Sequence, residues 1–381
     1  MTIEFQREIL PLIKQRLFEP GKIIILYGPR QVGKTTLSKQ ILHEYDSDNG
    51  YFNCETQIVE STLQSKDPTT MFRTFGGHKV IVFDEAQTIL NIGKALKLLI
   101  DTYPEMSIIA TGSSSFDLAN KIAEPLTGRH WSYFLFPISF NELIQLRGNR
   151  EVFESLNQVM IYGSYPEVLT TRTSLDAQLL LNELATDYAY RDLFKYKVIQ
   201  NLQVLTDILR ALSLQVGNEV SLNELARLVG VDKKTVSSYI NLLEQAFIIF
   251  HLSPYNTNQR KEIKRPKKYY FYDNGMMSAF GGGFSEVDNR LNIGAQWENL
   301  MIAERKKYNQ RKQNICANYF WRLQNSGEVD YVEISNQILH PYEFKWNKDK
   351  AKRSSYNFNK LYPNAEPLQI INNHNFFDFV I

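Results

Sequence analysis

The stretch Gly28-Pro29-Arg30-Gln31-Val32-Gly33-Lys34-Thr35 decides the fold of the first part of this chain. It follows the apolar run Ile23–Tyr27 and leads into a helical pattern that begins at Thr36, so the order is buried strand, glycine-rich loop and helix. The spacing matches G-x-x-x-x-G-K-[ST], in which loop N–H groups and the amino end of the helix hold phosphates. Lys34 then reaches the β- and γ-phosphates, and Thr35 offers its hydroxyl to Mg²⁺. The stretch from Gly28 to Thr36 therefore predicts a nucleoside triphosphate site.

A second apolar run ends in two carboxylates. Val80–Phe83 is followed directly by Asp84 and Glu85, so both acids are expected at the carboxyl end of a buried parallel strand, where ligands bind in such sheets. Asp84 is the predicted partner of Mg²⁺ through water, and Glu85 the predicted residue that orients and activates the attacking water. An acidic pair at a strand end is a weak signal alone, but together with the upstream loop it indicates nucleotide hydrolysis.

Length, charge and cysteine content set the class of protein. A chain of 381 residues is long for one core and favours two to four domains. The net charge of +2 gives no overall electrostatic argument for nucleic acid, so any basic surface must be local. Cys54 and Cys316 are far apart and lack metal-ligand spacing, which favours a reducing compartment. No signal pattern and no apolar run of bilayer length occur. We therefore predict a cytoplasmic protein without a membrane partner.

Six motifs together carry a family resemblance. They are, in chain order, GPRQVGKTT, VIVFDEAQ, ATGSSS, LTGR, FPISFNEL and GSYPEVL. In this combination the chain resembles, over nearly its whole length, a bacterial and archaeal family of AAA-type ATPases related to the STAND and archaeal ATPase lineage. Members of that family carry a C-terminal domain of unknown function. The resemblance implies an α/β fold with a P-loop parallel sheet, ATP and Mg²⁺ as cofactors, and a helical lid; it also admits a homo-oligomer.

Three further nucleotide-site candidates follow from this resemblance. Ser113, or Thr111 at the end of the preceding strand, matches the position of a γ-phosphate sensor, although a serine-rich turn also caps helices. Arg129 lies where such proteins place an arginine finger that acts from a neighbouring subunit or a moving domain. The alternatives for Arg129 are a helix C-terminal cap and a surface ion pair. Pro166 matches a lid motif and is a candidate contact on the adenine side.

Residues 203–280 show the order of a winged helix-turn-helix. Ser221 and Glu224 form a capping box for a short helix, and a turn at Gly230 leads into a longer one. The start of that second helix, where a recognition helix meets DNA, carries Lys233, Lys234, Thr235 and Ser237. The basic segment 260–268 would lie at the wing and contact phosphates. The alternatives are that the domain binds protein or braces the lid.

In the C-terminal region a helix precedes antiparallel strands, and period-2 alternation puts Glu343 and Lys345 on one face of their strand. Asp330 lies on the neighbouring strand and Glu298 on the helix. This arrangement resembles the core of PD-(D/E)XK nucleases. The resemblance implies that Glu298, Asp330 and Glu343 hold Mg²⁺ and that Lys345 activates water for attack on a phosphodiester. An intact nuclease fold without activity is the alternative.

The predicted organisation is an ATPase core at 1–139, a helical lid at 140–202, a winged helix at 203–280 and an α/β restriction-endonuclease-like domain at 290–381. The leading hypothesis is an ATP-hydrolysing, DNA-associated protein whose C-terminal domain is a Mg²⁺-dependent nuclease or a nuclease-derived DNA-binding unit. The alternative is a nucleotide-controlled switch that captures a partner protein and has an inactive nuclease-like domain. A small-molecule kinase on the same loop leaves the other domains without a role.

Overall fold

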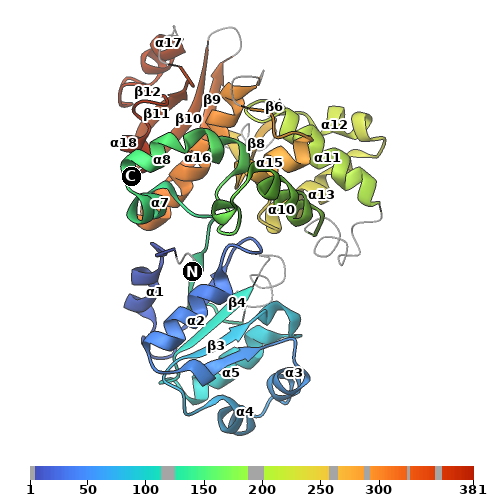
Figure 1. Ribbon diagram of the computed structural model, residues 1–381, viewed down its shortest axis with the longest axis vertical. Helices are drawn as coiled ribbons and strands as arrows, with labels where there is room; N and C mark the ends of the chain where they lie inside the picture. The colour runs from blue at the N-terminus through green and yellow to red at the C-terminus, as the bar shows by residue number, and fades with distance from the viewer. Residues whose placement is uncertain are drawn as a thin grey trace. The chain divides into compact units, whose positions relative to one another are not determined.

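The computed structural model describes residues 5–112, 125–187, 201–256, 265–286, 292–323, 327–347 and 354–381. The chain forms two compact units (Figure 1). The first comprises Met1–Ile138 with Gln245–Phe247, and the second comprises Ser139–Glu244 with Ile248–Ile381. No helix in these described ranges is both long enough and apolar enough to cross a membrane.

The first unit is built on a five-stranded parallel sheet with the order β2-β3-β4-β1-β5. The strands are β1 (Ile23–Tyr27), β2 (Tyr51–Asn53), β3 (Ile81–Asp84), β4 (Ile108–Gly112) and β5 (His130–Phe134). The helices are α1 (Leu10–Arg16), α2 (Lys34–Glu44), α3 (Gln57–Gln64), α4 (Pro68–Phe75) and α5 (Ile92–Thr102), with short turns η1 (Asp48–Gly50) and η2 (Ala86–Thr88). The predicted α/β fold with a parallel sheet is confirmed.

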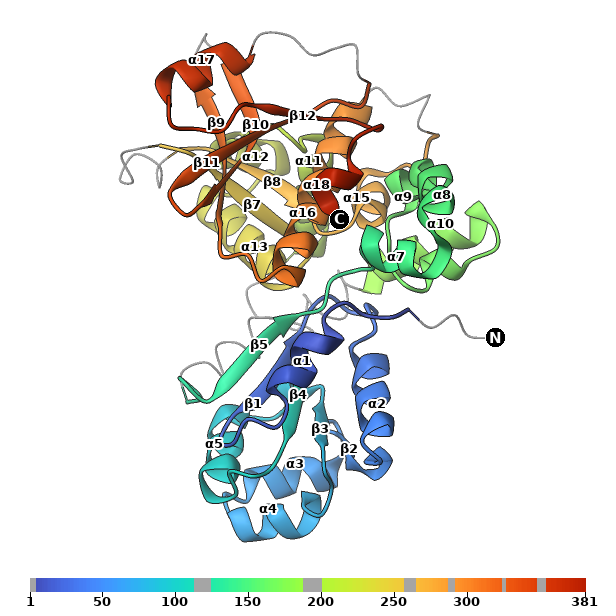
Figure 2. The same cartoon turned by 90° about the vertical axis from the view of Figure 1, so that its left-hand side faces the viewer.

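The two faces of this sheet are covered by different helices (Figure 2). On one face, Ile23, Ile25 and Phe83 share a buried cluster with apolar side chains of α3, α4 and α5. Helix α2 contacts β3 and β4 and buries its own apolar residues. Because both faces are covered, the central strands are continuous apolar runs, and polar residues appear only where the strands end. That pattern places the functional side chains at the carboxyl edge of the sheet.

The second unit begins with helices. They are α7 (Phe140–Arg147), α8 (Asn149–Glu154), α9 (Leu156–Tyr162), α10 (Ser174–Asp187), α11 (Leu202–Leu214), α12 (Leu222–Val229) and α13 (Lys233–Gln245), with a turn η3 (Val168–Thr170). Helix α7 starts with a capping box in which Ser139 accepts from the Glu142 N–H. The predicted cap of α12 is also present, since Ser221 accepts from the Glu224 N–H. Helix α12 ends at Gly230 in the left-handed conformation, which turns the chain into α13.

A seven-stranded sheet with the order β12-β11-β10-β9-β7-β8-β6 runs through the rest of this unit. Its strands are β6 (Glu219–Val220), β7 (Ile249–Pro254), β8 (Lys267–Phe271), β9 (Ala317–Leu323), β10 (Gly327–Ser335), β11 (Ile338–Phe344) and β12 (Gln369–Ile371). The accompanying helices are α15 (Asn274–Gly281), α16 (Ile293–Arg311), α17 (Ser354–Leu361) and α18 (Phe377–Val380). Strand β7 pairs in parallel with β9, so β6, β7 and β8 share one sheet with the strands of the C-terminal region.

Candidate functional site

The glycine-rich loop joins β1 to α2, and two of its glycines are required by the backbone. A Cβ atom on Gly28 would lie 2.2 Å from the carbonyl oxygen of Leu135, which any side chain would have to displace. Gly33 precedes α2 with φ +98°, a conformation that other residues rarely adopt. The loop therefore takes the tight path that the motif predicts, and the amino end of α2 opens onto it.

Lys34, the first residue of α2, is buried and turns back over the loop. Its ammonium group donates to the carbonyl oxygens of Gly28 (2.9 Å) and Pro29 (2.7 Å). Both acceptors belong to the loop that would surround a phosphate chain. Phosphate oxygens are stronger acceptors than these carbonyls, because hydrogen bonds between charged groups are the stronger ones. Lys34 is thus poised to exchange loop carbonyls for nucleotide phosphates.

Thr35 and Asp84 meet across the carboxyl edge of the sheet. The Thr35 hydroxyl donates to Oδ2 of Asp84 at 2.8 Å, and Asp84 is buried at the end of β3. The Thr111 hydroxyl at the end of β4 donates to the other carboxylate oxygen. A hydroxyl and a carboxylate next to a phosphate loop form the oxygen donor set that Mg²⁺ prefers, completed by water and phosphate. The residues present therefore fit Mg²⁺, which when bound with nucleotide would neutralise phosphate charge.

Glu85 has an unusual backbone conformation next to this pair. Its φ is +54°, in the left-handed region, and its side chain accepts a hydrogen bond from the Gln87 amide. Its own N–H donates to the Thr111 hydroxyl at 3.3 Å. Backbone strain of this kind costs about 1–3 kcal/mol and concentrates at functional sites. The structure thus brings Lys34, Thr35 and Asp84 together with Glu85 at one edge of the sheet.

Arg7 is a loop-supporting residue that the sequence analysis missed. Arg7 lies in the short segment before α1, which begins at Leu10. Its guanidinium donates to the carbonyls of Val32 (2.6 Å) and Phe136 (2.5 Å), and the residue is buried. It therefore fixes the loop from behind. A buried arginine before the first strand has no local sequence signal, because its partners lie 25 and 129 residues away.

The other nucleotide-site candidates lie elsewhere. Ser113 lies outside the described residues. Arg129 precedes β5 and its carbonyl accepts from Ile23 at the start of β1, so it lies at the amino edge of the sheet, away from the loop of its own chain. Its guanidinium pairs with Asp101 at 2.6 Å. Pro166 follows α9 in the second unit.

A buried hydrogen-bond network adjoins the turn at residues 163–166, which contains Pro166. Asp273 accepts hydrogen bonds from the N–H of Ser164 (2.7 Å), Gly275 (2.8 Å) and Met276 (3.1 Å). Gly163 lies against the same carboxylate, so close that a Cβ atom would be 2.0 Å from Asp273 Oδ1. Burial raises the pKa of Asp273, and the backbone donors oppose that rise. The motif is thereby tied to the start of α15.

Helix α16 holds the same region from the other side. Lys307 donates to the Ser164 hydroxyl at 3.2 Å and pairs with Glu304 at 2.5 Å. Glu304 also accepts from the N–H of Phe140 at the start of α7 (2.9 Å). Lys307, Glu304 and Ser164 are all buried. Helix α7 and the turn at Ser164 are thus hydrogen-bonded to α16 within the second unit.

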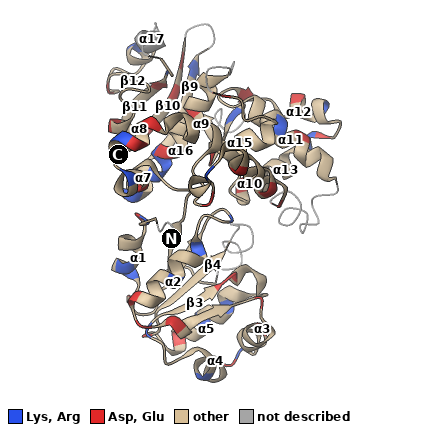
Figure 3. Ribbon diagram, in the orientation of Figure 1, with Lys and Arg blue, Asp and Glu red and all other residues tan. Residues whose placement is uncertain are grey.

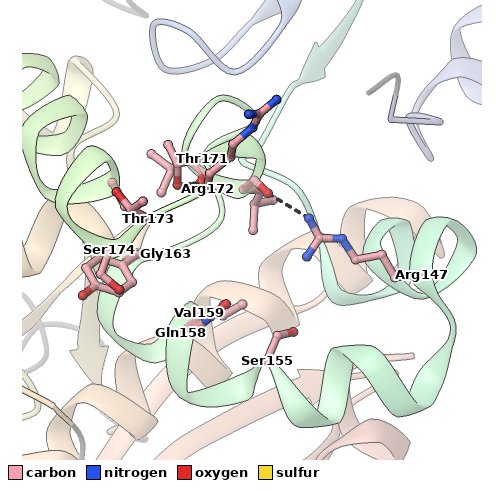
Figure 4. Close-up of a pocket in the computed structure, with 13 residues that line it drawn as sticks. Arg147, Ser155, Gln158, Val159, Gly163, Thr171, Arg172, Thr173 and Ser174 are labelled. Carbon is pink, nitrogen blue, oxygen red and sulfur yellow. Dashed lines mark hydrogen bonds between the residues drawn. The ribbon is translucent and has the colours of Figure 1, made fainter. Parts of the chain in front are cut away.

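A small pocket of about 120 Å³ adjoins this motif between α7, α9 and α10 (Figure 4). Arg147 crosses it and donates to the Leu169 carbonyl at 2.8 Å, which ties the η3 turn to α7. The remaining lining is mostly hydroxyl, amide and apolar groups. The pocket lies where α7, α9 and α10 meet, and we assign it no ligand.

The predicted recognition helix, α13, presents part of the expected basic surface. Lys233 and Lys234 are exposed at its first two positions. Thr235 instead serves the helix start, since its hydroxyl and N–H both bond to Asp232 (2.6 and 3.0 Å). That hydroxyl bond is the main cause that lowers the pKa of Asp232. Ser237 lies one turn further along and is partly exposed. Charges of both signs are interspersed over the described ribbon (Figure 3).

The predicted nuclease residues are gathered at one place in the second unit. Strands β10 and β11 pair Tyr331 with Tyr342, which puts Asp330 and Glu343 at the next rung. Lys345 pairs with Glu343 at 2.8 Å and feels the charges of Asp330 and Glu298. Asp330 accepts from the Phe344 N–H at 2.8 Å. The residues predicted from the sequence therefore lie close enough together for their charges to interact.

Lys268 on β8 also lies among these carboxylates. We call the four carboxylates, Glu298, Glu328, Asp330 and Glu343, the acidic cluster. Lys268 lies 3.5 Å from Glu298 and 2.5 Å from Glu328, and Tyr270 donates to Glu298 at 2.7 Å. Burial raises the pKa of Glu298 to about 7, and the Lys268 charge opposes that rise. Burial lowers the pKa of Lys345, but the carboxylates beside it raise the pKa by more.

Mg²⁺ does not fit this cluster as it fits the phosphate loop. Mg²⁺ requires about six oxygen ligands in nearly octahedral geometry. In the described part of the chain, no three His, Cys, Asp or Glu side chains are grouped so that they could hold a metal ion. Within the cluster the carboxylate charge faces Lys268 and Lys345. No reaction step is therefore assigned to a metal ion at this place.

Family models match three consecutive parts of the chain. Residues 20–144 match an AAA domain, 153–288 match a domain of unknown function (DUF8612), and 293–378 match a second domain of unknown function (DUF4143). Among curated relatives, an uncharacterized protein of Mycobacterium tuberculosis is 29% identical over 345 residues, which cover 87% of this chain and 71% of the relative. Another from Haemophilus influenzae is 25% identical over 346 residues, 83% of each chain.

Two solved structures show weak similarity. A STAND protein with a tetratricopeptide repeat sensor from Pyrococcus horikoshii has a TM-score of 0.29 at 12% identity, covering 82% of this chain and 48% of that one. AMPPCP-bound DnaA from Aquifex aeolicus has a TM-score of 0.25 at 14% identity, covering 61% and 86%. Similarity at this level does not establish a shared fold. The expected AAA-type region is confirmed by the family match at residues 20–144 together with the parallel α/β sheet.

Proposed function

We propose that the first unit binds ATP with Mg²⁺ and hydrolyses it, and that the second unit responds to the nucleotide state. The observation that carries this proposal is the Thr35 to Asp84 hydrogen bond of 2.8 Å beside the buried ammonium of Lys34. Phosphate-binding and metal-binding groups thus converge from the loop and from β3. Loop N–H groups and the amino end of α2 hold the phosphates, and Lys34 neutralises them.

Glu85 is the proposed base that orients the attacking water. It directly follows the metal-side carboxylate, and its hydrogen bond from Gln87 keeps the side chain in place. Removing the charge and the proton-accepting ability should slow the chemical step without weakening phosphate binding, because binding uses other residues.

We therefore expect Glu85→Gln to bind ATP with wild-type affinity and to hydrolyse it on the order of 100-fold more slowly. Phosphate release under saturating ATP and calorimetric binding measure the two quantities separately. Glu55→Gln is the matched control. It makes the same chemical change at an exposed glutamate of the same unit. Unchanged hydrolysis by Glu85→Gln would remove Glu85 from the mechanism.

The second unit is proposed to contact DNA through α13. The supporting observation is that Lys233 and Lys234 are both exposed at the start of the second helix of a helix-turn-helix arrangement. Lysines at such a position contact phosphates and release counterions, which makes affinity salt-dependent. The competing proposal, capture of a partner protein by the same unit, predicts no such salt dependence.

For Lys233→Ala with Lys234→Ala, we expect weaker binding to duplex DNA and a slope of log affinity against log salt reduced by about 2. Fluorescence anisotropy over a salt series measures both. The control pair, Lys94→Ala with Lys97→Ala, removes two exposed lysines from α5 and leaves the net charge equal. Equal slopes for the two double variants would favour the partner-protein switch.

A finger role for Arg129 is retained only between copies of the chain. Because Arg129 lies at the amino edge of its own sheet, it would have to serve the loop of another subunit. Nucleic-acid cleavage at Glu298, Asp330, Glu343 and Lys345 is left out of the proposed function, since the donor set does not fit a metal ion. The functional unit proposed for the second part is thus a lid, a helix-turn-helix and a nuclease-like fold that act together.

A further inference from the structure

The ammonium group of Lys268 lies inside the acidic cluster of the second unit. Its side chain is 1% exposed, so the charge is removed from water. It lies 3.5 Å from Glu298 and 2.5 Å from Glu328. We propose that Lys268 is the permanent counter-ion of this cluster, and that the cluster is a metal-free junction between β8, α16 and β10.

The balance of charge supports this assignment. Four carboxylates take part, from Glu298, Glu328, Asp330 and Glu343, and two ammonium groups face them, from Lys268 and Lys345. Each cation has a partner within ion-pair distance, and Asp330 in addition accepts a backbone N–H. Buried charges are tolerated only when opposite charges lie close by, as the ion pairs of Lys268 and Lys345 do here.

A divalent cation would have to compete with a lysine that is buried among the carboxylates. The Lys268 stem begins on β8, between β7 and β6 in the sheet, and its ammonium lies 5.2 Å from the centre of the Phe320 ring on β9. Tyr270 donates to Glu298 from the same strand, which occupies an oxygen that a metal would need. Repulsion between Mg²⁺ and a fixed ammonium is large where water is excluded.

The junction connects parts of the chain that are distant in sequence. Lys268 belongs to the basic segment expected at the wing, whereas Glu298 lies on α16 and Asp330 on β10. Helix α16 also contacts β8 along the sheet (Figure 1). Ion pairs therefore join β8 to α16 and β10, through residues that resemble a nuclease site.

The test compares Mn²⁺ binding by full-length proteins without nucleotide, in an Asp84→Asn background that disables the loop site. Electron paramagnetic resonance reports the bound ion directly. We expect no saturable Mn²⁺ binding while Lys268 is present. Saturable binding that disappears on Glu343→Gln would overturn the proposal, and this arm needs no change at Lys268.

The second arm is Lys268→Met, which keeps the stem and removes the charge. We expect the unfolding temperature to fall on the order of 10 °C, and Mn²⁺ to recover part of that loss. Lys306→Met is the matched control, because Lys306 also lies partly buried, with its ammonium 4.6 Å from the Phe250 ring centre. A loss no larger than that of Lys306→Met would contradict a counter-ion role.

Discussion

Replacing Lys34 by alanine is expected to lower the affinity for ATP on the order of 100-fold, because hydrogen bonds to charged groups contribute about 1.5–3 kcal/mol each. Lys34 is buried against the loop and already donates two hydrogen bonds to its carbonyls. These positions are the ones that phosphate oxygens would take over. Titration calorimetry with ATP and Mg²⁺ measures the change.

Lys97→Ala provides the control for this prediction. Lys97 is exposed on α5 in the same unit, so its loss changes the net charge equally without touching the loop. Circular dichroism should show both variants folded, since the Lys34 bonds are made within one short loop. Equal ATP affinity in the two variants would contradict the assignment of the loop.

Replacing Gly163 by alanine should destabilise the second unit by about 5 kcal/mol. The backbone there has φ +70° and ψ −158°, a region that is almost restricted to glycine. The new Cβ would also lie 2.0 Å from the Asp273 carboxylate and force it away from three backbone N–H donors. Chemical denaturation gives the loss of unfolding free energy.

Gly148→Ala separates the two causes. Gly148 has a similar backbone, with φ +82° and ψ 159°, but a Cβ atom there would meet nothing within 4 Å. Its cost should therefore be the conformational one alone, about 2 kcal/mol. The Asp273 network would lose its stabilising role in this account if both glycine variants were equally unstable.

The nucleotide site could be predicted because its signals are local. The loop from Gly28 to Thr35 and the acids after β3 are each continuous in sequence, and parallel strands bring their carboxyl ends to one edge. Arg7 could not be predicted in the same way. Its role depends on carbonyls of Val32 and Phe136, and any arginine in an amphipathic segment gives the same local pattern.

In the second unit, local helix signals could be predicted from the sequence, but the pairing between distant strands could not. The cap at Ser221 and the turn at Gly230 were predicted from adjacent residues, and both are present. By contrast, β7 pairs with β9, although more than sixty residues separate the two strands. The choice of partner strand is hard to predict, because nearly every residue offers the same backbone N–H and carbonyl groups for pairing.

For charged residues, too, the sequence does not show which partners the fold brings together, as the acidic cluster illustrates. Alternation along β11 placed Glu343 and Lys345 on one face, and both are found in the cluster. Lys268 was read as part of an exposed basic segment, whereas the structure buries it among the carboxylates. A lysine at the start of a strand has the same local sequence whether it faces DNA or a buried acid, and only the fold separates the two.

The central claim, that this chain hydrolyses ATP at the loop and the end of β3, is tested most directly by phosphate release from ATP. Wild type is assayed with Mg²⁺, with a chelator, and beside Glu85→Gln at equal protein concentration. The account predicts Mg²⁺-dependent release that is nearly lost in Glu85→Gln while ATP binding persists. Release that continues in the variant, or a wild type that does not bind ATP, would contradict it.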